Sequence, residues 1–126
     1  MEEKLGHVLV VEDEYLIALD LVEVLEQHGA IIVGPFSSIA HARAAIEDAA
    51  KLDGAVIDIN IRGELSFPIA DLLRQRQVPF IFTSGYDQVV IPLSLSEVPL
   101  VSKPADSSEI VGLLANLIGK GRPALQ

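Results

Sequence analysis

The sequence predicts an α/β fold in which a five-stranded parallel sheet carries helices on both faces. Short runs of aliphatic and β-branched residues alternate along the chain with longer segments of helical periodicity, an order typical of parallel strands joined by crossover helices. The run at 7–11, for example, is apolar after His7 and shows no alternation, as expected for a strand covered on both faces. The strand order 2-1-3-4-5 is the natural doubly wound arrangement for so small a sheet.

The first half of the chain is predicted to form three strands and two helices. In order, these are a strand at residues 7–11, a helix at 14–28, a strand at 30–34, a helix from Ser37 or Ser38 to about Ala50, and a strand at 55–59. Gly29 follows the first helix as a stop signal, and Pro35 closes the second strand. Either serine has a side-chain oxygen that suits the N-cap of the second helix.

The second half continues the alternation. We expect a helix at about 69–76, a strand at 80–84, a strand at 99–102 and a last helix that ends near Gly119. Pro68 opens the first of these helices, and a polar loop with Gly63 precedes it. The run from Asp106 to Glu109 has the capping-box pattern for the start of the last helix. Residues 120–126 are expected to fray.

One interval, between Ser84 and Pro99, departs from the regular alternation. It contains a β-branched run at residues 89–91 followed by Pro92, and both features disfavour a helix. We therefore expect a short, irregular or mobile fourth helix in this interval.

The composition indicates one acidic domain. The chain has 126 residues, enough for a single domain with a core at about 5–119, and 50% of them are hydrophobic. Lys and Arg number 9 against 18 Asp and Glu, so the formal charge is −9 and the surface should repel nucleic acid and anionic membranes. The sequence has no cysteine, no signal peptide and no apolar run of the roughly 20 residues that a membrane helix needs, so we expect a cytoplasmic protein.

Polar side chains gather where the predicted strands end. The first strand ends in Glu12 and Asp13, the third in Asp58, the fourth in Ser84, and the fifth in Lys103. Because ligands of open parallel sheets bind at the carboxyl ends of the strands, we expect these side chains to share one edge. Packing of the hydrophobic core does not explain why polar residues follow so many of the strands.

This set of residues suits phosphoryl transfer to an aspartate. Crowded carboxylates repel one another unless a cation lies among them, and oxygen ligands without His or Cys favour Mg²⁺, or Mn²⁺, over zinc. Lys103 adds a positive charge, so the site could accept a phosphoryl group beside its acids. A carboxylate can attack phosphorus to form an acyl phosphate, and the Ser84 hydroxyl could donate to a phosphoryl oxygen.

Taken in order, these motifs resemble the receiver domains of two-component response regulators over essentially the whole chain, from Leu5 to Gly119. The run from Val10 to Glu14 resembles the acidic pair after the family's first strand, and Asp58-Ile59-Asn60 resembles its phospho-acceptor strand end. Lys103-Pro104 resembles the family's lysine followed by proline, usually a cis peptide. The segment from Pro79 to Tyr86 further resembles the single-domain receivers called FAT GUY, found in alphaproteobacteria.

The resemblance implies a flavodoxin-like (βα)5 fold and a magnesium-dependent phospho-acceptor site. Asp58 would accept the phosphoryl group from a histidine kinase or a histidine phosphotransfer protein. Asp13 would bind Mg²⁺ directly, Glu12 directly or through water, and Asn60 through its backbone carbonyl. The protein would then catalyse only its own phosphorylation and dephosphorylation, without turnover of a diffusible product.

Further residues would bind or tune the phosphoryl group in such a domain. The resemblance implies that Ser84 and Lys103 hold the phosphoryl oxygens, with Pro104 next to the lysine. Asn60 and Tyr86 lie at positions where the family tunes the lifetime of the phosphoryl group.

The same resemblance implies that other proteins read the signal. No output domain fits in 126 residues, so we expect an unidentified protein partner or a role as phosphate sink or relay. The domain would be a monomer or a weak dimer.

Two features depart from the family pattern. The aromatic switch residue of many receivers, three positions before the lysine, is Leu100 here. The weak fourth helix puts the usual output face in doubt. Ordering of residues 86–98 on phosphorylation is a possible substitute for the aromatic switch.

Simpler interpretations exist for several of these residues, but not for Lys103, because a lysine between an apolar strand and a proline needs a partner. Asp58 could cap the following loop, Ser84 could bind a loop amide, and Glu12 with Asp13 could complement the N-terminus of the first helix. Leu16 and Ile17, in the first turn of that helix, could be part of a wide apolar stripe or could contact the phosphodonor.

Two alternative functions exist for the whole chain. One is a degenerate receiver that acts as a binding module independently of phosphorylation. The other is a phosphohydrolase of the haloacid-dehalogenase type, but those enzymes use Asp-x-Asp, and the second position is Asn60 here.

Overall fold

The computed structural model describes residues 5–85 and 90–121 and has the predicted α/β architecture. The strands of the main sheet are β1 (Gly6–Val11), β2 (Ala30–Phe36), β3 (Gly54–Asp58), β6 (Phe80–Ser84) and β7 (Leu100–Ser102). They are parallel and lie in the order β2-β1-β3-β6-β7, which confirms the predicted order of first to fifth strand. The helices are α1 (Tyr15–Gln27), α2 (Ile39–Asp48), α3 (Phe67–Gln75) and α4 (Ser107–Gly121).

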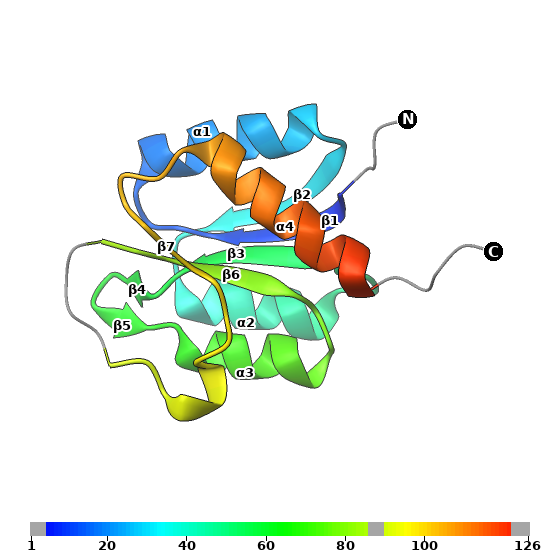
Figure 1. The fold of residues 1–126 in the computed structure, drawn as a ribbon. Helices are drawn as coiled ribbons and strands as arrows, with labels where there is room; N and C mark the ends of the chain where they lie inside the picture. The colour runs from blue at the N-terminus through cyan, green and yellow to red at the C-terminus, as the bar shows by residue number, and fades with distance from the viewer. Residues whose placement is uncertain (1–4, 86–89, 122–126) are drawn as a thin grey trace.

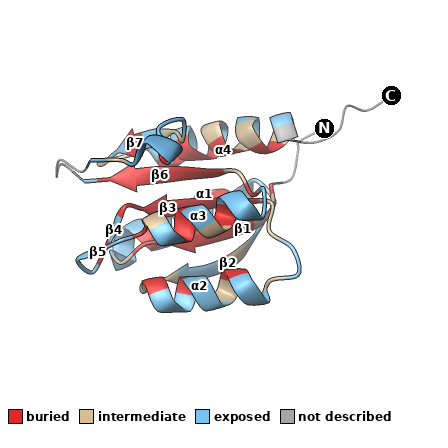
Figure 2. Cartoon of the chain, turned by 90° about the horizontal axis from the view of Figure 1, so that it is seen from below, coloured by how far each residue is buried: buried red, intermediate tan, exposed pale blue. Residues whose placement is uncertain are grey.

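The helices form two layers, with α1 and α4 on one face of the sheet and α2 and α3 on the other (Figure 1). Successive residues of a strand point to opposite faces, so each central strand supplies both layers. In β1, Leu9 and Val11 pack in the core under α2 and α3, whereas Val8 and Val10 pack under α1 and α4. The central strands β3 and β6 are therefore buried along their whole length, and β1 is buried from Val8 onward (Figure 2).

The second strand continues past Pro35, where the sequence suggested that it would close. β2 runs to Phe36, whose carbonyl accepts a hydrogen bond of 2.9 Å from the Glu12 N–H. A proline is tolerated because β2 lies at an edge of the sheet. The outer side of an edge strand has no neighbouring strand, so a missing N–H on that side breaks no hydrogen bond of the sheet. Gly34 has φ +112°, and a Cβ there would lie 2.8 Å from the Val10 carbonyl oxygen, so the close approach of β1 and β2 requires glycine.

The predicted polar loop around Gly63 is a small β-hairpin. β4 (Asn60–Ile61) and β5 (Glu64–Leu65) pair in antiparallel fashion around the turn residues Arg62 and Gly63. Both turn residues have positive φ, 52° and 83°, as a two-residue type I′ turn requires. Helix α3 then begins at Phe67, slightly earlier than expected.

The connection between β6 and β7 confirms the weak fourth helix. In residues 90–99, which the structure describes, the regular element is a single 3₁₀ turn, η1 (Leu93–Leu95). Leu95 is buried in the core beside α3, while Leu93 is 90% exposed. Leu95, together with the partly buried Ile91 and Val98, therefore packs this segment against the core.

The helix caps follow the sequence signals. The Ser38 hydroxyl accepts a 3.1 Å hydrogen bond from the His41 N–H at the start of α2. The Asp106 carboxylate accepts a 2.9 Å hydrogen bond from the Ser108 N–H at the start of α4. Helix α4 reaches Gly121, beyond the expected end near Gly119. Within residues 5–85 and 90–121, no helix has the length and apolar character needed to cross a bilayer.

Candidate functional site

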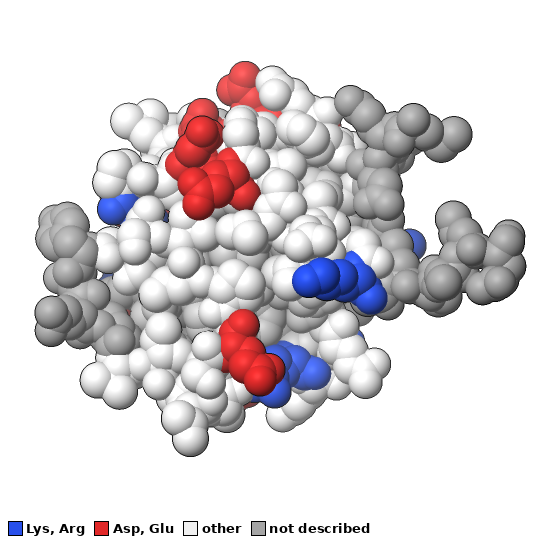
Figure 3. Space-filling view, viewed as in Figure 1, with Lys and Arg blue, Asp and Glu red and all other residues white. Residues whose placement is uncertain are grey.

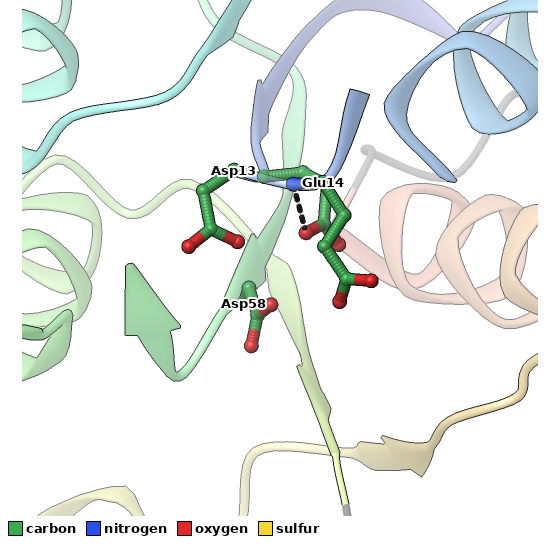
Figure 4. A group of neighbouring side chains, drawn as sticks. Asp13, Glu14 and Asp58 are labelled. Carbon is green, nitrogen blue, oxygen red and sulfur yellow. Dashed lines mark hydrogen bonds between the residues drawn. The ribbon is translucent and has the colours of Figure 1, made fainter. Parts of the chain in front are cut away.

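Four carboxylates meet at the carboxyl ends of β1 and β3. Glu12, Asp13 and Glu14 form the connection from β1 to α1, and Asp58 is the last residue of β3. Each offers an oxygen within 4.8 Å of the others. Figure 4 shows Asp13, Glu14 and Asp58 pointing into the same space from two neighbouring strands. The sequence identified three of these acids and missed the role of Glu14.

Lys103 lies directly after β7 and places its ammonium among the acids. The Nζ atom lies 2.6 Å from Asp58 Oδ2, 2.8 Å from Glu12 Oε1 and 3.2 Å from Glu14 Oε1. The backbone fixes this position, because the Lys103 N–H donates a 2.7 Å hydrogen bond to the carbonyl of Ser84 on the neighbouring strand. The peptide bond to Pro104 is cis, as in the family that the sequence resembles.

Burial strengthens the electrostatic coupling within this cluster. Loss of solvent raises the pKa of Glu12 to about 7, although hydrogen bonds from Lys103 and from the Glu14 N–H offset part of that rise. Burial by itself would lower the pKa of Lys103, but hydrogen bonds to Asp58 and Glu12 outweigh it and raise that pKa. The lysine therefore stays charged and faces a carboxyl group whose charge is costly.

Asp58 is held through its own backbone. The carbonyl oxygen of Asp58 accepts a 2.7 Å hydrogen bond from the Ser66 hydroxyl, which is fully buried. The Asn60 N–H donates to Asp58 Oδ1 at 3.3 Å. Sequence reasoning missed Ser66, and the only available signal was a serine just ahead of the proline-containing first turn of α3.

Asp13 is held from the β4–β5 hairpin. The Arg62 N–H donates a 2.8 Å hydrogen bond to Asp13 Oδ2. The side-chain oxygen of Asn60 accepts from the Gly63 N–H at 2.8 Å, so this amide braces the turn. The sequence assigned no role to Arg62, because its contribution comes from a backbone N–H.

The remaining candidates lie around the same edge. Ser84, the last residue of β6, is buried, and its hydroxyl donates to the Gly85 carbonyl at 3.2 Å. Tyr86 lies outside the described residues. Leu100, which stands at the position of the aromatic switch, is a half-exposed residue of β7.

An apolar surface adjoins the acidic cluster. A cavity of about 220 Å³ lies between the start of α1 and the connection from β7 to α4, with Glu12 and Lys103 in its lining. Leu16 and Ile17 also line it and are exposed, Leu16 to 77%. The apolar stripe of α1 therefore extends to the surface beside the site, which leaves both interpretations of these two residues open.

The donor set of the cluster fits a hard divalent cation. Four carboxylates face one ammonium group, so the cluster is net negative when all four are ionised. The cluster is made of carboxylate oxygens, which suit Mg²⁺ or Mn²⁺.

The fold and the sequence are similar to solved receiver domains. SdrG from Sphingomonas melonis Fr1 is 35% identical, with 92% of this chain and 98% of that chain covered and a TM-score of 0.74. The receiver domain of PhyR from Erythrobacter litoralis is 26% identical over 95% of each chain, with a TM-score of 0.75. The BeF₃-activated conformation of SdrG from Pseudomonas melonis Fr1 is 33% identical over 92% of this chain and 98% of that chain, with a TM-score of 0.72. No family model and no curated protein matches the sequence.

Proposed function

The chain belongs to the receiver-domain family of two-component response regulators, and from this we propose that it accepts a phosphoryl group on Asp58 in a Mg²⁺-dependent reaction. The observation that carries the proposal is the position of Lys103 Nζ, which lies 2.6 Å from Asp58 Oδ2 and 2.8 Å from Glu12 Oε1. Such a contact brings a cation whose side chain is 11% exposed to the end of the strand that carries the acceptor. Packing of the sheet alone does not require a contact between Lys103 and Asp58.

Phosphoryl transfer would begin at the Asp58 carboxylate. One of its oxygens attacks the phosphorus of a phosphohistidine, a P–O bond forms, and the P–N bond breaks with its electron pair moving to the imidazole nitrogen. The product is an acyl phosphate on Asp58. Water can later attack the phosphorus, the P–O bond to Asp58 breaks, and inorganic phosphate leaves, so the carboxylate is restored and can accept again.

Mg²⁺ would offset the negative charge that accumulates when a phosphoryl group meets several carboxylates. Asp13, Glu12 and Asp58 would hold it, with the backbone carbonyl of Asn60 as a further ligand. Mn²⁺ has the same preference for oxygen ligands and could replace it.

Lys103 and Ser84 would bind the transferred group. The ammonium of Lys103 is within reach of Asp58 and needs to move little to pair with a phosphoryl oxygen. Within the part of the chain that the structure describes, the Ser84 hydroxyl donates to the neighbouring Gly85 carbonyl at 3.2 Å, so it can turn toward a stronger acceptor. Tyr86 and Asn60 remain candidates for tuning the lifetime of the acyl phosphate, and Pro104 for positioning Lys103.

The partners would be proteins. We propose a histidine kinase or histidine phosphotransfer protein as donor, with the exposed Leu16 and Ile17 beside the site as part of its contact surface. For output we propose a protein partner or a sink or relay role, in the cytoplasm and without turnover of a diffusible product. The face that carries α4 and η1 has few charged side chains (Figure 3), and Leu93 and Leu100 are exposed there. Such a surface suits a protein better than a nucleic acid.

Beryllium fluoride, a phosphoryl mimic, tests the site without interference from fast hydrolysis. With Mg²⁺ present, it should shift the amide NMR signals of residues around Asp58, Ser84 and Lys103 in the wild type. The same addition should leave Asp58→Asn unchanged, because the mimic needs the carboxylate. Asp71→Asn, which removes an exposed carboxylate of α3, should respond like the wild type. An unresponsive wild type would contradict the proposal.

A further inference from the structure

We propose that the β4–β5 hairpin is a positioning element for Asp13. The Arg62 N–H donates a 2.8 Å hydrogen bond to Asp13 Oδ2, and the other oxygen, Oδ1, can then ligate a divalent cation in the acidic cluster. The inference rests on the proposed function, because it assumes that this cluster binds Mg²⁺. Arg62 itself is not a catalytic residue and acts only through Asp13.

The turn aims two N–H groups at side chains of the site. In a two-residue hairpin the turn residues lie outside the ladder, so their N–H groups are free for other acceptors. The Gly63 N–H donates to Asn60 Oδ1 at 2.8 Å, and the Arg62 N–H donates to Asp13 Oδ2. The positive φ of Arg62, 52°, is a costly conformation for a residue other than glycine. The hairpin maintains it, and with it the direction of the N–H.

The hairpin is also fixed to the body of the protein. Ile61 is fully buried in the core under α2 and α3. The Ser66 N–H closes the base of the hairpin by donating to the Ile59 carbonyl at 2.8 Å. The Arg62 guanidinium reaches Ser37 Oγ, just before α2, at 3.3 Å. The N–H that holds Asp13 is therefore in place before a cation arrives.

The hydrogen bond from the Arg62 N–H to Asp13 should increase the affinity of the acidic cluster for Mg²⁺. Groups that orient a metal ligand through a hydrogen bond typically contribute about 10-fold to 100-fold in affinity when they are removed. We therefore expect loss of the Arg62 N–H to weaken Mg²⁺ binding by at least about tenfold. The maximal phosphorylation rate at saturating Mg²⁺ should change much less than the Mg²⁺ concentration for half-maximal rate.

The test measures the Mg²⁺ dissociation constant of the full chain by amide NMR titration without a phosphodonor. Arg62→Pro removes the N–H and also disrupts the turn, because the proline ring fixes φ at about −65°. Arg62→Gly keeps the N–H and suits the positive φ, so of these two variants only Arg62→Pro should bind weakly. Gly63→Ala strains the turn at φ +83° without a clash, because no atom lies within 4 Å of the new Cβ. It should weaken binding by about fivefold. Gly112→Ala in α4, also free of clashes, is the matched control and should leave binding unchanged.

A second measurement separates positioning from folding. Urea midpoints of all variants are recorded without metal, and in the metal-free wild type the Arg62 amide should exchange at least about tenfold more slowly than in Asp13→Ala. Equal Mg²⁺ affinity in the wild type, Gly63→Ala and any folded Arg62→Pro would overturn the inference alone. A wild type that binds no Mg²⁺ would overturn both this inference and the proposed function. Weakened Mg²⁺ binding in the variants, with no phosphorylation of the wild type, would overturn the function and support the inference.

Discussion

Lys103 is the side chain on which the acidic cluster depends. Its ammonium lies within 3.2 Å of three carboxylate oxygens, from Glu12, Glu14 and Asp58. Two of these acids are buried, so their charges are poorly solvated and rely on the lysine. The four carboxylates repel one another, and a bound cation would reduce that repulsion.

Replacing Lys103 with glutamine should destabilise the metal-free protein by about 2 kcal/mol, because buried carboxylates then lose a charged hydrogen-bond donor. Chemical unfolding in EDTA measures the change. Lys120→Gln removes an exposed lysine in the last turn of α4 and should leave the midpoint unchanged. A Lys103→Gln protein as stable as the wild type would show that the ion pairs contribute no net stability.

Sequence reasoning found the side chains of the site that stand at strand ends. Glu12, Asp13, Asp58 and Lys103 could be placed together because the carboxyl ends of parallel strands meet at one edge. Their supports could not be found in this way. The Ser66 hydroxyl reaches a backbone carbonyl and the Arg62 contribution is a backbone N–H, so both depend on local geometry rather than residue type.

Among the secondary-structure elements, the connection between β6 and β7 departs most from a regular βα unit. Its described part holds the short turn η1, and Leu95 is the buried residue of that turn. The segment enters β7, whose end carries Lys103. The packing of this segment therefore contributes to the core through Leu95 and to the position of Lys103 in the site.

Leu95→Ala should lower the free energy of unfolding by about 3 kcal/mol, because it leaves a cavity in the core beside α3. Leu93→Ala makes the same substitution in the same turn at a side chain that is 90% exposed, and should change stability by less than about 0.5 kcal/mol. Urea unfolding of the two variants is the measurement. Equal losses would mean that η1 does not fasten the segment through Leu95.

Element prediction succeeded where periodicity was clear and failed where turn geometry decided. The alternation of apolar runs and helical segments was enough for the five-stranded order, and Pro92 with its β-branched neighbours indicated the weak fourth helix. The β4–β5 hairpin was missed because its turn is Arg62-Gly63 rather than the more familiar Asn-Gly. The extension of β2 was missed because a proline at an edge strand does not end pairing.

For the molecule as a whole, the parallel sheet collects charge at one end. The chain carries a formal charge of −9, and four of its acids come together at the ends of β1 and β3. The two core layers hold these strands in register, so the acids cannot easily move apart. Binding of a cation should therefore stabilise the entire fold.

Mg²⁺ at about 100 times its dissociation constant should stabilise the folded state by about 2.7 kcal/mol, since the proposed site exists only when folding assembles the cluster. Unfolding midpoints in Mg²⁺ and in EDTA measure the gain. Asp13→Asn should lose most of it, and Asp71→Asn, on the exposed side of α3, should keep it. Equal gains in both variants would place the cation outside the cluster.

Phosphorylation of Asp58 is tested most directly by the intact mass of the wild type and Asp58→Asn after incubation with acetyl phosphate. We expect a single phosphoryl adduct that requires Mg²⁺, is removed by EDTA and is absent from Asp58→Asn. Release of inorganic phosphate is followed in parallel, so that rapid hydrolysis of the adduct is also detected. The proposed receiver chemistry would be contradicted if the wild type gave neither an adduct nor Asp58-dependent phosphate release, or if Asp58→Asn were labelled equally.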